Sequence, residues 1–216
     1  MDSHVSRSEP IGDMTELHSD YCFFKDKKSD KVNSATGLVT QDRKSGGICA
    51  HVCPKKGIGG GWIVKQFVRD IKKFGYQSKI VLRSDGEPAI KDLLSKVGEM
   101  RGAETVLEQS RTGDSKANGR AERAIQSVEK QVRVLKIATE KSLGSRFGVK
   151  HKCFPWLVMH AADVITKCQI HRDGRTAYEN IKQRKYTGLM LKWGTVVLHK
   201  VSVKVQGGVM ESRWIK

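Results

Sequence analysis

The sequence predicts an α/β fold in which a mixed sheet, three antiparallel strands plus two parallel strands, is flanked by helices. Three observations carry this prediction. Short strand-like segments fill the first quarter of the chain, apolar strands then alternate with segments of helical periodicity, and 216 residues suffice to bury one sizeable core. An antiparallel start followed by strand–helix–strand crossovers gives a mixed sheet.

The chain is expected to hold one main domain. Residues 1–15 are polar without periodicity, which is typical of a disordered leader or linker. Residues 16–190 form the expected domain. Residues 191–216 are interpreted as the start of a β-rich segment that the chain does not complete, because 194–205 alternates like a strand or hairpin.

Three strand-like segments open the domain. The first contains Leu17, Tyr21 and Phe23, and the others cover residues 37–40 and 47–53. Charged or glycine-containing turns separate them, which favours antiparallel pairing.

Helices and strands then alternate. Apolar side chains recur at helical spacing over residues 62–74, and an apolar strand at 79–83 leads into a second helix over 88–97. Residues 105–107 form the fifth strand. The glycine run at 57–61 lacks the Gly-Lys-Ser/Thr ending of a phosphate-binding loop and is interpreted as a turn.

The next helix has the clearest periodicity in the chain. Its expected core face consists of Ala121, Ile125, Val128, Val132, Leu135 and Thr139. Another apolar helix is expected over 153–170, followed by a basic segment that ends near Lys185.

The charge balance indicates a polyanionic partner. Forty Lys and Arg against 23 Asp and Glu give a formal net charge of +17, and such an excess favours phosphate binding through counterion release. No apolar stretch is long enough to cross a bilayer or to form a signal peptide, so we expect no membrane association and no secretion.

The five cysteines are expected to be buried, reduced thiols. Their number is odd, no C-x-x-C pair occurs, and most lie in apolar runs. Cys49, His51 and Cys53 share a strand face, but a structural zinc site needs a fourth ligand, so zinc is not favoured.

Three acidic residues stand in differently built segments. Asp20 lies inside the first strand on the face of His18 and Cys22, Asp85 ends an apolar strand just before a helix, and Glu122 lies about 100° from the apolar stripe of its helix. Each has an ordinary explanation: a surface strand position, a helix start, and a first-turn acid favoured by the helix dipole. An acid in an apolar strand nevertheless lowers stability unless it is paired or holds a metal.

Together these segments resemble a known motif. Asp20, Ser84-Asp85-Gly-Glu and Asn118-Gly-x-x-Glu122 are similar to the D,D-35-E triad of the integrase catalytic core, a ribonuclease-H-like domain. Thirty-six residues lie between Asp85 and Glu122, one more than in the motif's name. Further similarities at 42–47, 155–156 and 174–179 point to long-terminal-repeat retrotransposons, copia-like or gypsy-like, which are related to retroviruses.

Two departures from the family pattern stand out. Only His4 and His18 precede the core, so no His-His-Cys-Cys zinc module is present there, and the chain ends soon after Trp193. The expectation is therefore a core that comes from a longer polyprotein.

The resemblance implies a polynucleotidyl transferase and endonuclease that trims the 3′ ends of element DNA and transfers them into target DNA. It implies that Asp20, Asp85 and Glu122 are the catalytic residues and hold two Mg²⁺ (or Mn²⁺) ions. The implied partners are DNA, as element ends and target, and further copies of the chain, with no small-molecule substrate. The expected location is the nucleus or a cytoplasmic nucleoprotein particle.

Four residues are candidates for DNA binding. Asn118 resembles the family position that contacts the DNA end beside the site. Arg123, Lys130 and Arg133 lie on the strongly basic helix and are candidates for phosphate contacts, although a solvated charged face is the ordinary explanation of such a pattern.

Three other functions stay open from the sequence. The first is a catalytically inactive or domesticated integrase-like domain that binds DNA. The second is a ribonuclease-H-type nuclease, for which Asp163 is the candidate for a further catalytic acid. The third is a basic module that coats nucleic acid without catalysis.

Overall fold

The computed structural model describes residues 15–27, 33–109, 118–197, 199–200 and 214–215. The chain divides into two compact units, Met1–Tyr186 and Thr187–Lys216. Apart from Thr15, the predicted leader lies outside the described residues.

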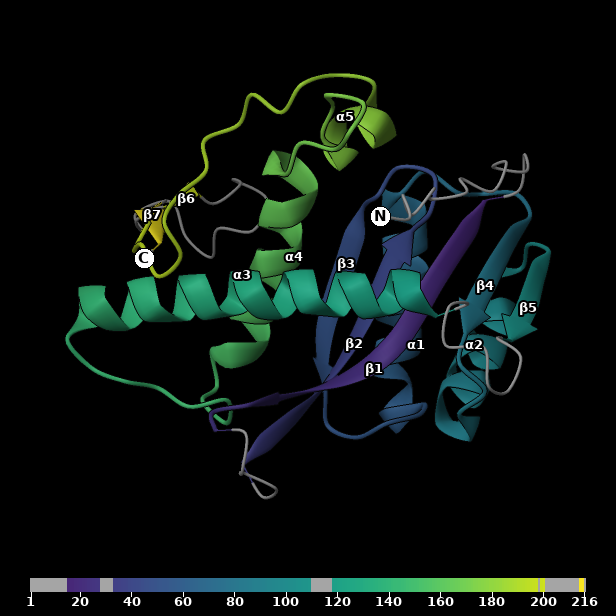
Figure 1. Ribbon diagram of the computed structural model, residues 1–216, viewed down its shortest axis with the longest axis horizontal. Helices are drawn as coiled ribbons and strands as arrows, with labels where there is room; N and C mark the ends of the chain where they lie inside the picture. The colour runs from purple at the N-terminus through teal and green to yellow at the C-terminus, as the bar shows by residue number, and fades with distance from the viewer. Residues whose placement is uncertain (1–14, 28–32, 110–117, 198, 201–213, 216) are drawn as a thin grey trace, which may run out of the picture. The chain divides into compact units, whose positions relative to one another are not determined.

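A five-stranded mixed sheet forms the centre of the first unit (Figure 1). Its strands are β1 (Glu16–Lys25), β2 (Ser34–Asp42), β3 (Ile48–Cys53), β4 (Ile80–Ser84) and β5 (Thr105–Gln109). Their order is β3-β2-β1-β4-β5. β1, β2 and β3 pair antiparallel, whereas β4 runs parallel to both β1 and β5. This arrangement confirms the predicted fold class.

One face of the sheet packs against α1 (Trp62–Lys73) and α2 (Pro88–Arg101). The buried residues there include Leu17, Tyr21, Leu38, Ile63, Val64, Phe67, Ile71, Ile80, Leu82, Leu93 and Val97. Each such side chain contributes about 1.5–3 kcal/mol by leaving water, so this face holds the main core. Trp62, the first apolar residue of the helical pattern at 62–74, is 47% exposed, because it begins α1 beside the glycine turn.

The other face of the sheet lies under α3 (Gly119–Leu143) and α4 (Phe154–Cys168). In Figure 1, α3 crosses the strands and its N-terminal end lies over β1. The rings of Phe24 and Phe154 meet edge to face at 5.7 Å. Gly37 is required here, since a Cβ atom would come within 2.5 Å of the Phe24 ring and 2.7 Å of the Cys22 sulfur.

The buried stripe of α3 differs in part from the expected one. Ala121, Val128, Val132 and Thr139 are buried as predicted, but Ala124 is buried in place of Ile125, and Leu135 is only half-buried. At its N-terminal end α3 lies close to the sheet, so the small side chain of Ala124 faces the sheet and the larger side chain of Ile125 lies to one side.

The cysteines also correct the sequence analysis. Cys22 and Cys53 are buried and Cys49 is half-buried, but Cys153 and Cys168 are exposed at the two ends of α4. Both lie at the ends of an apolar segment, where α4 extends beyond the core. The apolar sequence alone does not show where burial stops.

Shorter elements complete the fold. The glycine run contains the 3-10 turn η1 (Gly59–Gly61), and α5 (Ala177–Lys182) begins with a capping box between Thr176 and Glu179. In the second unit, β6 (His199–Lys200) pairs with β7 (Trp214–Ile215), and the rest of the predicted strand after residue 200 lies outside the described residues. In the described part of the chain, no helix is both long and apolar enough to span a bilayer.

Candidate functional site

Asp20 lies in the middle of β1 on the face covered by α3. Its Oδ2 accepts a hydrogen bond of 2.7 Å from Nδ2 of Asn118, the residue just before α3. Its Oδ1 accepts one of 2.7 Å from the backbone N–H of Tyr21. Asn118, the predicted DNA-contact residue, is buried. Its side-chain amide holds the carboxylate of Asp20, the predicted catalytic acid, in place.

Asp85 reaches the same region from a different strand. It follows the end of β4, which lies parallel beside β1, at the carboxyl-end position where ligands gather in α/β sheets. The Oδ1 atom of Asp85 accepts a hydrogen bond of 3.2 Å from the backbone N–H of Glu87, which fixes the turn into α2.

The Asp20 carboxylate is affected by its burial and by the charge of Asp85. Burial raises the pKa of Asp20 above its ordinary value, and the negative charge of Asp85 raises it further, against the opposing effect of the hydrogen bonds from Tyr21 and Asn118. Within the described residues, neither Asp20 nor Asp85 forms an ion pair. In a protein of formal charge +17, these two acids thus lack a cationic partner among the residues that the structure describes.

The donor set of this acid pair suits a divalent cation. Carboxylate oxygens are preferred ligands of Mg²⁺, and a cation between Asp20 and Asp85 would relieve the repulsion that raises the pKa of Asp20. Among the described residues, however, no three His, Cys, Asp or Glu side chains stand close enough together to hold one ion. The fit therefore rests on two acids.

Glu122 is the predicted acid that is not grouped with the other two. It lies exposed in the first turn of α3, and its backbone N–H donates to the carbonyl oxygen of Asn118 at 3.1 Å. The bond to Asn118 keeps Glu122 within one helical turn of a residue that contacts Asp20. Its role as a metal ligand stays a prediction.

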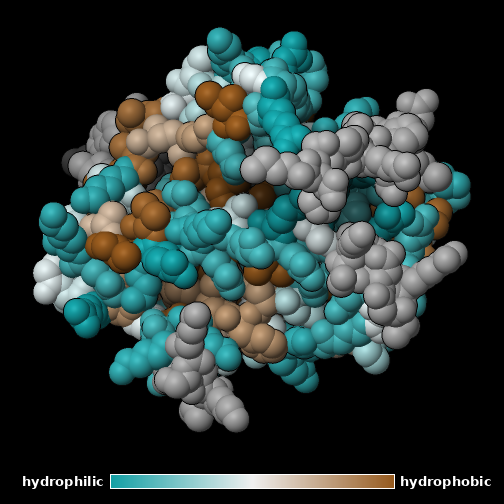
Figure 2. Space-filling view, viewed as in Figure 1, coloured by the Kyte–Doolittle hydropathy of each residue, from teal (hydrophilic) through white to brown (hydrophobic). Residues whose placement is uncertain are grey.

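The candidate phosphate contacts share one face of α3. Arg123, Lys130 and Arg133 are exposed and stand seven and three residues apart, which places them along one side of the helix. Figure 2 shows a largely hydrophilic surface on this side of the molecule, broken by apolar patches. Contact of these three residues with DNA stays a prediction.

Lys56 and Glu87 were not recognised as site residues from the sequence. The Lys56 ammonium binds the Glu87 carboxylate at 2.7 Å and lies 5.4 Å from the centre of the Tyr21 ring. The charge of Glu87 adds a small upward contribution to the pKa of Asp20, so this pair borders the acid site. No local pattern signals it, because the two residues stand 31 positions apart.

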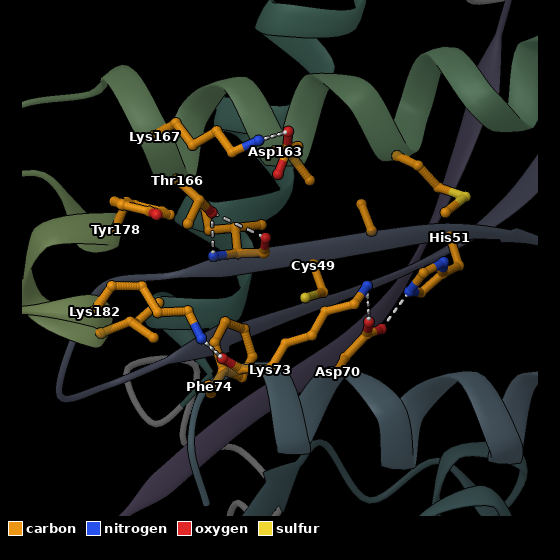
Figure 3. Close-up of a pocket in the computed structure, with 15 residues that line it drawn as sticks. Cys49, His51, Asp70, Lys73, Phe74, Asp163, Thr166, Lys167, Tyr178 and Lys182 are labelled. Carbon is orange, nitrogen blue, oxygen red and sulfur yellow. Dashed lines mark hydrogen bonds and ion pairs between the residues drawn. The ribbon is translucent and has the colours of Figure 1, made fainter. Parts of the chain in front are cut away.

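A separate cavity of about 210 Å³ lies beside the edge strand β3, between α1, α4 and α5 (Figure 3). Its wall contains Asp70, Lys73, Asp163 and Lys167. Asp163 forms an ion pair of 2.7 Å with Lys167. Since β2 separates β3 from β1, Asp163 of α4, in the wall of the cavity beside β3, lies near a different strand from the one that carries Asp20.

A buried carboxylate stabilises the wall of this cavity. Asp70 accepts hydrogen bonds from His51 at 2.5 Å and Lys73 at 3.1 Å (Figure 3). It accepts a third from Gln66 at 3.3 Å. Burial alone would raise the pKa of Asp70, but the bonds and charges of His51 and Lys73 outweigh burial and hold that pKa below its ordinary value. Asp70 is therefore a structural acid.

Replacing Asp70 with Asn should lower the free energy of unfolding at pH 7 by about 1–3 kcal/mol, because buried donors lose a charged acceptor. A lowered pKa means that the carboxylate contributes stability above the ordinary Asp value of 3.8 and loses it as the pH falls through the folded-state value. Urea unfolding at pH 7 and pH 3 should therefore show the deficit of Asp70→Asn shrinking in acid. The control Asp163→Asn, in a pair whose acid is 49% exposed, should cost under about 1 kcal/mol. An equal deficit at both pH values would contradict this account.

The fold has counterparts among solved structures. The integrase catalytic core domain of BIV aligns with a TM-score of 0.53 at 15% identity, over 78% of this chain and 93% of that one. The HTLV-2 integrase catalytic core domain in complex with magnesium gives 0.54 at 12% identity, over 77% and 95%. A simian T-cell lymphotropic virus intasome bound to a PP2A regulatory subunit gives 0.56 at 13%, over 93% and 66%.

These likenesses show that the chain has the ribonuclease-H-like fold of integrase catalytic cores. No protein-family model and no curated protein sequence matches the chain. The family likeness seen in the sequence thus agrees with the fold, while the assignment to retrotransposons stays a prediction.

Proposed function

We propose that this chain is an integrase catalytic core that processes the 3′ ends of DNA and joins them to target DNA. The observation that carries the proposal is that Asp85, at the end of β4, lies close enough to Asp20 of β1 for its charge to raise the pKa of Asp20, with Asn118 bonded to Asp20 at 2.7 Å. These residues stand on a fold shared with retroviral integrase cores, one of them solved with magnesium.

Asp20, Asp85 and Glu122 would hold the Mg²⁺ or Mn²⁺ ions, two in number by family likeness. Bound metal would make the attacking oxygen, first of water and then of a DNA 3′ hydroxyl, more nucleophilic and would stabilise the leaving oxygen. The protein's own contribution is orientation. The amide of Asn118 and the backbone N–H of Tyr21 each hold one oxygen of Asp20.

DNA is the proposed substrate, as the ends of an element and as the target. The net charge of +17 and the exposed Arg123, Lys130 and Arg133 on α3 support a phosphate-rich partner. Further parts of the proposal are a long-terminal-repeat retrotransposon as the source, association of several copies to hold two DNA ends, and a location in the nucleus or in a nucleoprotein particle.

An integrase-like domain that binds DNA without catalysis is the second candidate. It is favoured by one observation: Glu122 is exposed and is not grouped with Asp20 and Asp85. A ribonuclease-H-type nuclease has less support, because Asp163, its candidate further acid, is paired with Lys167 beside β3.

Mg²⁺-dependent joining of an oligonucleotide 3′ hydroxyl to a target duplex tests the proposal. The full chain should join DNA in Mg²⁺ and not in EDTA. Asp85→Asn should lower the rate by on the order of 10²-fold or more, since loss of even an outer partner of a metal ligand costs 10–100-fold. Asp92→Asn, an exposed acid of α2, is the matched control and should join at the wild-type rate.

Cleavage of an RNA–DNA hybrid without joining would favour the nuclease. Salt-sensitive DNA binding with no joining in any divalent metal would favour the non-catalytic domain. Equal joining by wild type and Asp85→Asn would overturn the assignment of the site.

A further inference from the structure

Four arginines gather around the beginning of β1. The carboxylate of Glu16 binds Nη1 of Arg43 at 2.7 Å and lies 3.8 Å from Nη1 of Arg83. The same carboxylate is 3.3 Å from Nε2 of His18. Arg83 also pairs with Glu108 on β5. The half-buried carboxylate of Glu16 thus has several cationic or polar neighbours.

Arg120 comes to this group from the first turn of α3. Burial lowers the pKa of Arg120, and the charges of Arg43, Arg123 and Arg83 lower it further, against the opposing charge of Glu16. In the part of the chain that the structure describes, Arg120 makes no hydrogen bond or ion pair. The N–H groups of its guanidinium are therefore available to bind a ligand.

The cluster carries more positive than negative charge. Arg43, Arg83, Arg120 and Arg123 contribute four positive charges against the two of Glu16 and Glu108. His18 adds none near neutral pH, because burial and then the charges of Arg120 and Arg83 lower its pKa to about 4. The formal balance is +2, in a half-buried place where water screens poorly.

Two further features make the cluster receptive to an anion. The Nε of Arg43 is buried and, among the described residues, has no hydrogen-bond partner. The cluster also contains the first turn of α3, a helix of 25 residues, whose dipole adds positive potential at that end. The ordinary explanation of grouped arginines, a solvated surface, does not fit residues as buried as Arg43, whose side chain is 13% exposed.

The cluster adjoins the proposed catalytic acids. His18 and Asp20 stand two residues apart on the same face of β1, a separation of roughly 7 Å along a strand. Arg120 follows two residues after Asn118, which contacts Asp20. The separation of His18 and Asp20 corresponds to about one step between neighbouring phosphates of a DNA strand.

We propose that Arg43, Arg83, Arg120 and Arg123 form a binding site for a backbone phosphate of DNA, one or two nucleotides from the phosphodiester at Asp20 and Asp85. The inference rests on the proposed function for the identity of the ligand as DNA. The site positions the strand and reads no sequence, because guanidinium contacts to phosphate carry no base information.

The test is DNA binding by the full chain in EDTA, measured by fluorescence anisotropy over a series of salt concentrations. Arg120→Gln should weaken binding roughly tenfold, the equivalent of one charge-assisted hydrogen bond, for every sequence tried. The slope of log affinity against log salt should fall by about 0.9, the value for one phosphate contact. Arg120→Lys should restore the slope but only part of the affinity.

Arg69→Gln is the matched control, an exposed arginine of α1 on the opposite face of the sheet, and should change neither quantity. Thermal unfolding checks that each variant folds. If Arg120→Gln does not fold, the exposed Arg123→Gln keeps the test open with the same expected slope change.

Unchanged affinity and slope in a folded Arg120→Gln, or an equal loss in Arg69→Gln, would overturn the phosphate site. The two proposals fail separately. Wild-type joining with an unaffected Arg120→Gln refutes only the phosphate site, whereas the predicted binding loss without any joining refutes only the catalytic function.

Discussion

Replacing Asp20 with Asn is expected to abolish DNA joining and, at the same time, to raise the melting temperature at pH 7. Burial and the charge of Asp85 raise the pKa of Asp20, so the folded state carries a penalty for the ionised carboxylate. That penalty is absent below the ordinary value of 3.8 and grows as the pH rises through the folded-state value. Asn carries no charge and does not incur this penalty. The rise in melting temperature of Asp20→Asn should therefore be present at pH 7 and absent at pH 3.

The loss of joining by Asp20→Asn should be on the order of 10²-fold or more, because the variant removes a metal ligand and not only its supporting partner. Mg²⁺ should also affect the melting temperatures of wild type and Asp20→Asn differently. A ligand at 100 times its dissociation constant stabilises the folded state by about 2.7 kcal/mol, so Mg²⁺ should raise the melting temperature of wild type and leave that of Asp20→Asn unchanged.

Calorimetry with and without Mg²⁺, at pH 7 and pH 3, measures both effects. A lower melting temperature of metal-free Asp20→Asn at pH 7 would show that the carboxylate stabilises the fold. An equal rise with Mg²⁺ in both proteins would show that the ion binds elsewhere.

Replacing Glu122 with Gln should lower joining by a similar factor while leaving the fold intact. Its side chain is exposed, and surface substitutions usually change stability by less than about 0.5 kcal/mol. DNA affinity in EDTA should not fall, because the variant removes a negative charge from the helix that is proposed to face DNA. The matched control is Glu99→Gln, an exposed acid of α2, which should join normally.

Single-turnover joining in Mg²⁺, together with anisotropy in EDTA, measures these two properties. Normal joining by Glu122→Gln would show that the third acid of the motif is not required. Weakened DNA binding with the same loss of joining would assign Glu122 a structural role at the start of α3.

The strands and helices of the core could be predicted because their periodicity is local. β1, α1 and α3 each repeat apolar residues at the spacing of one element, and the order of elements then gives a mixed sheet. The exchange of Ala124 for Ile125 could not be predicted, since the spacing of a helix defines a broad stripe and only the distance to the sheet selects a residue within it.

Contacts between distant segments were the main part of the site that the sequence could not reveal. Asn118 and Asp20 are 98 residues apart, and their bond depends on how α3 crosses β1. The same holds for Arg120 beside Glu16, because the charges on an amphipathic helix do not indicate which strand they will face. Motif likeness named Asp20, Asp85, Glu122 and Asn118, but it did not indicate that Asn118 bonds to Asp20.

The position of a bound Mn²⁺ ion, found from anomalous diffraction in crystals of the full chain, tests the central claim most directly. The account predicts an ion held by Asp20 and Asp85, with Glu122 joining them as a ligand, and no such ion in Asp85→Asn. An ion bound away from Asp20 and Asp85, or none at a saturating Mn²⁺ concentration, would contradict it.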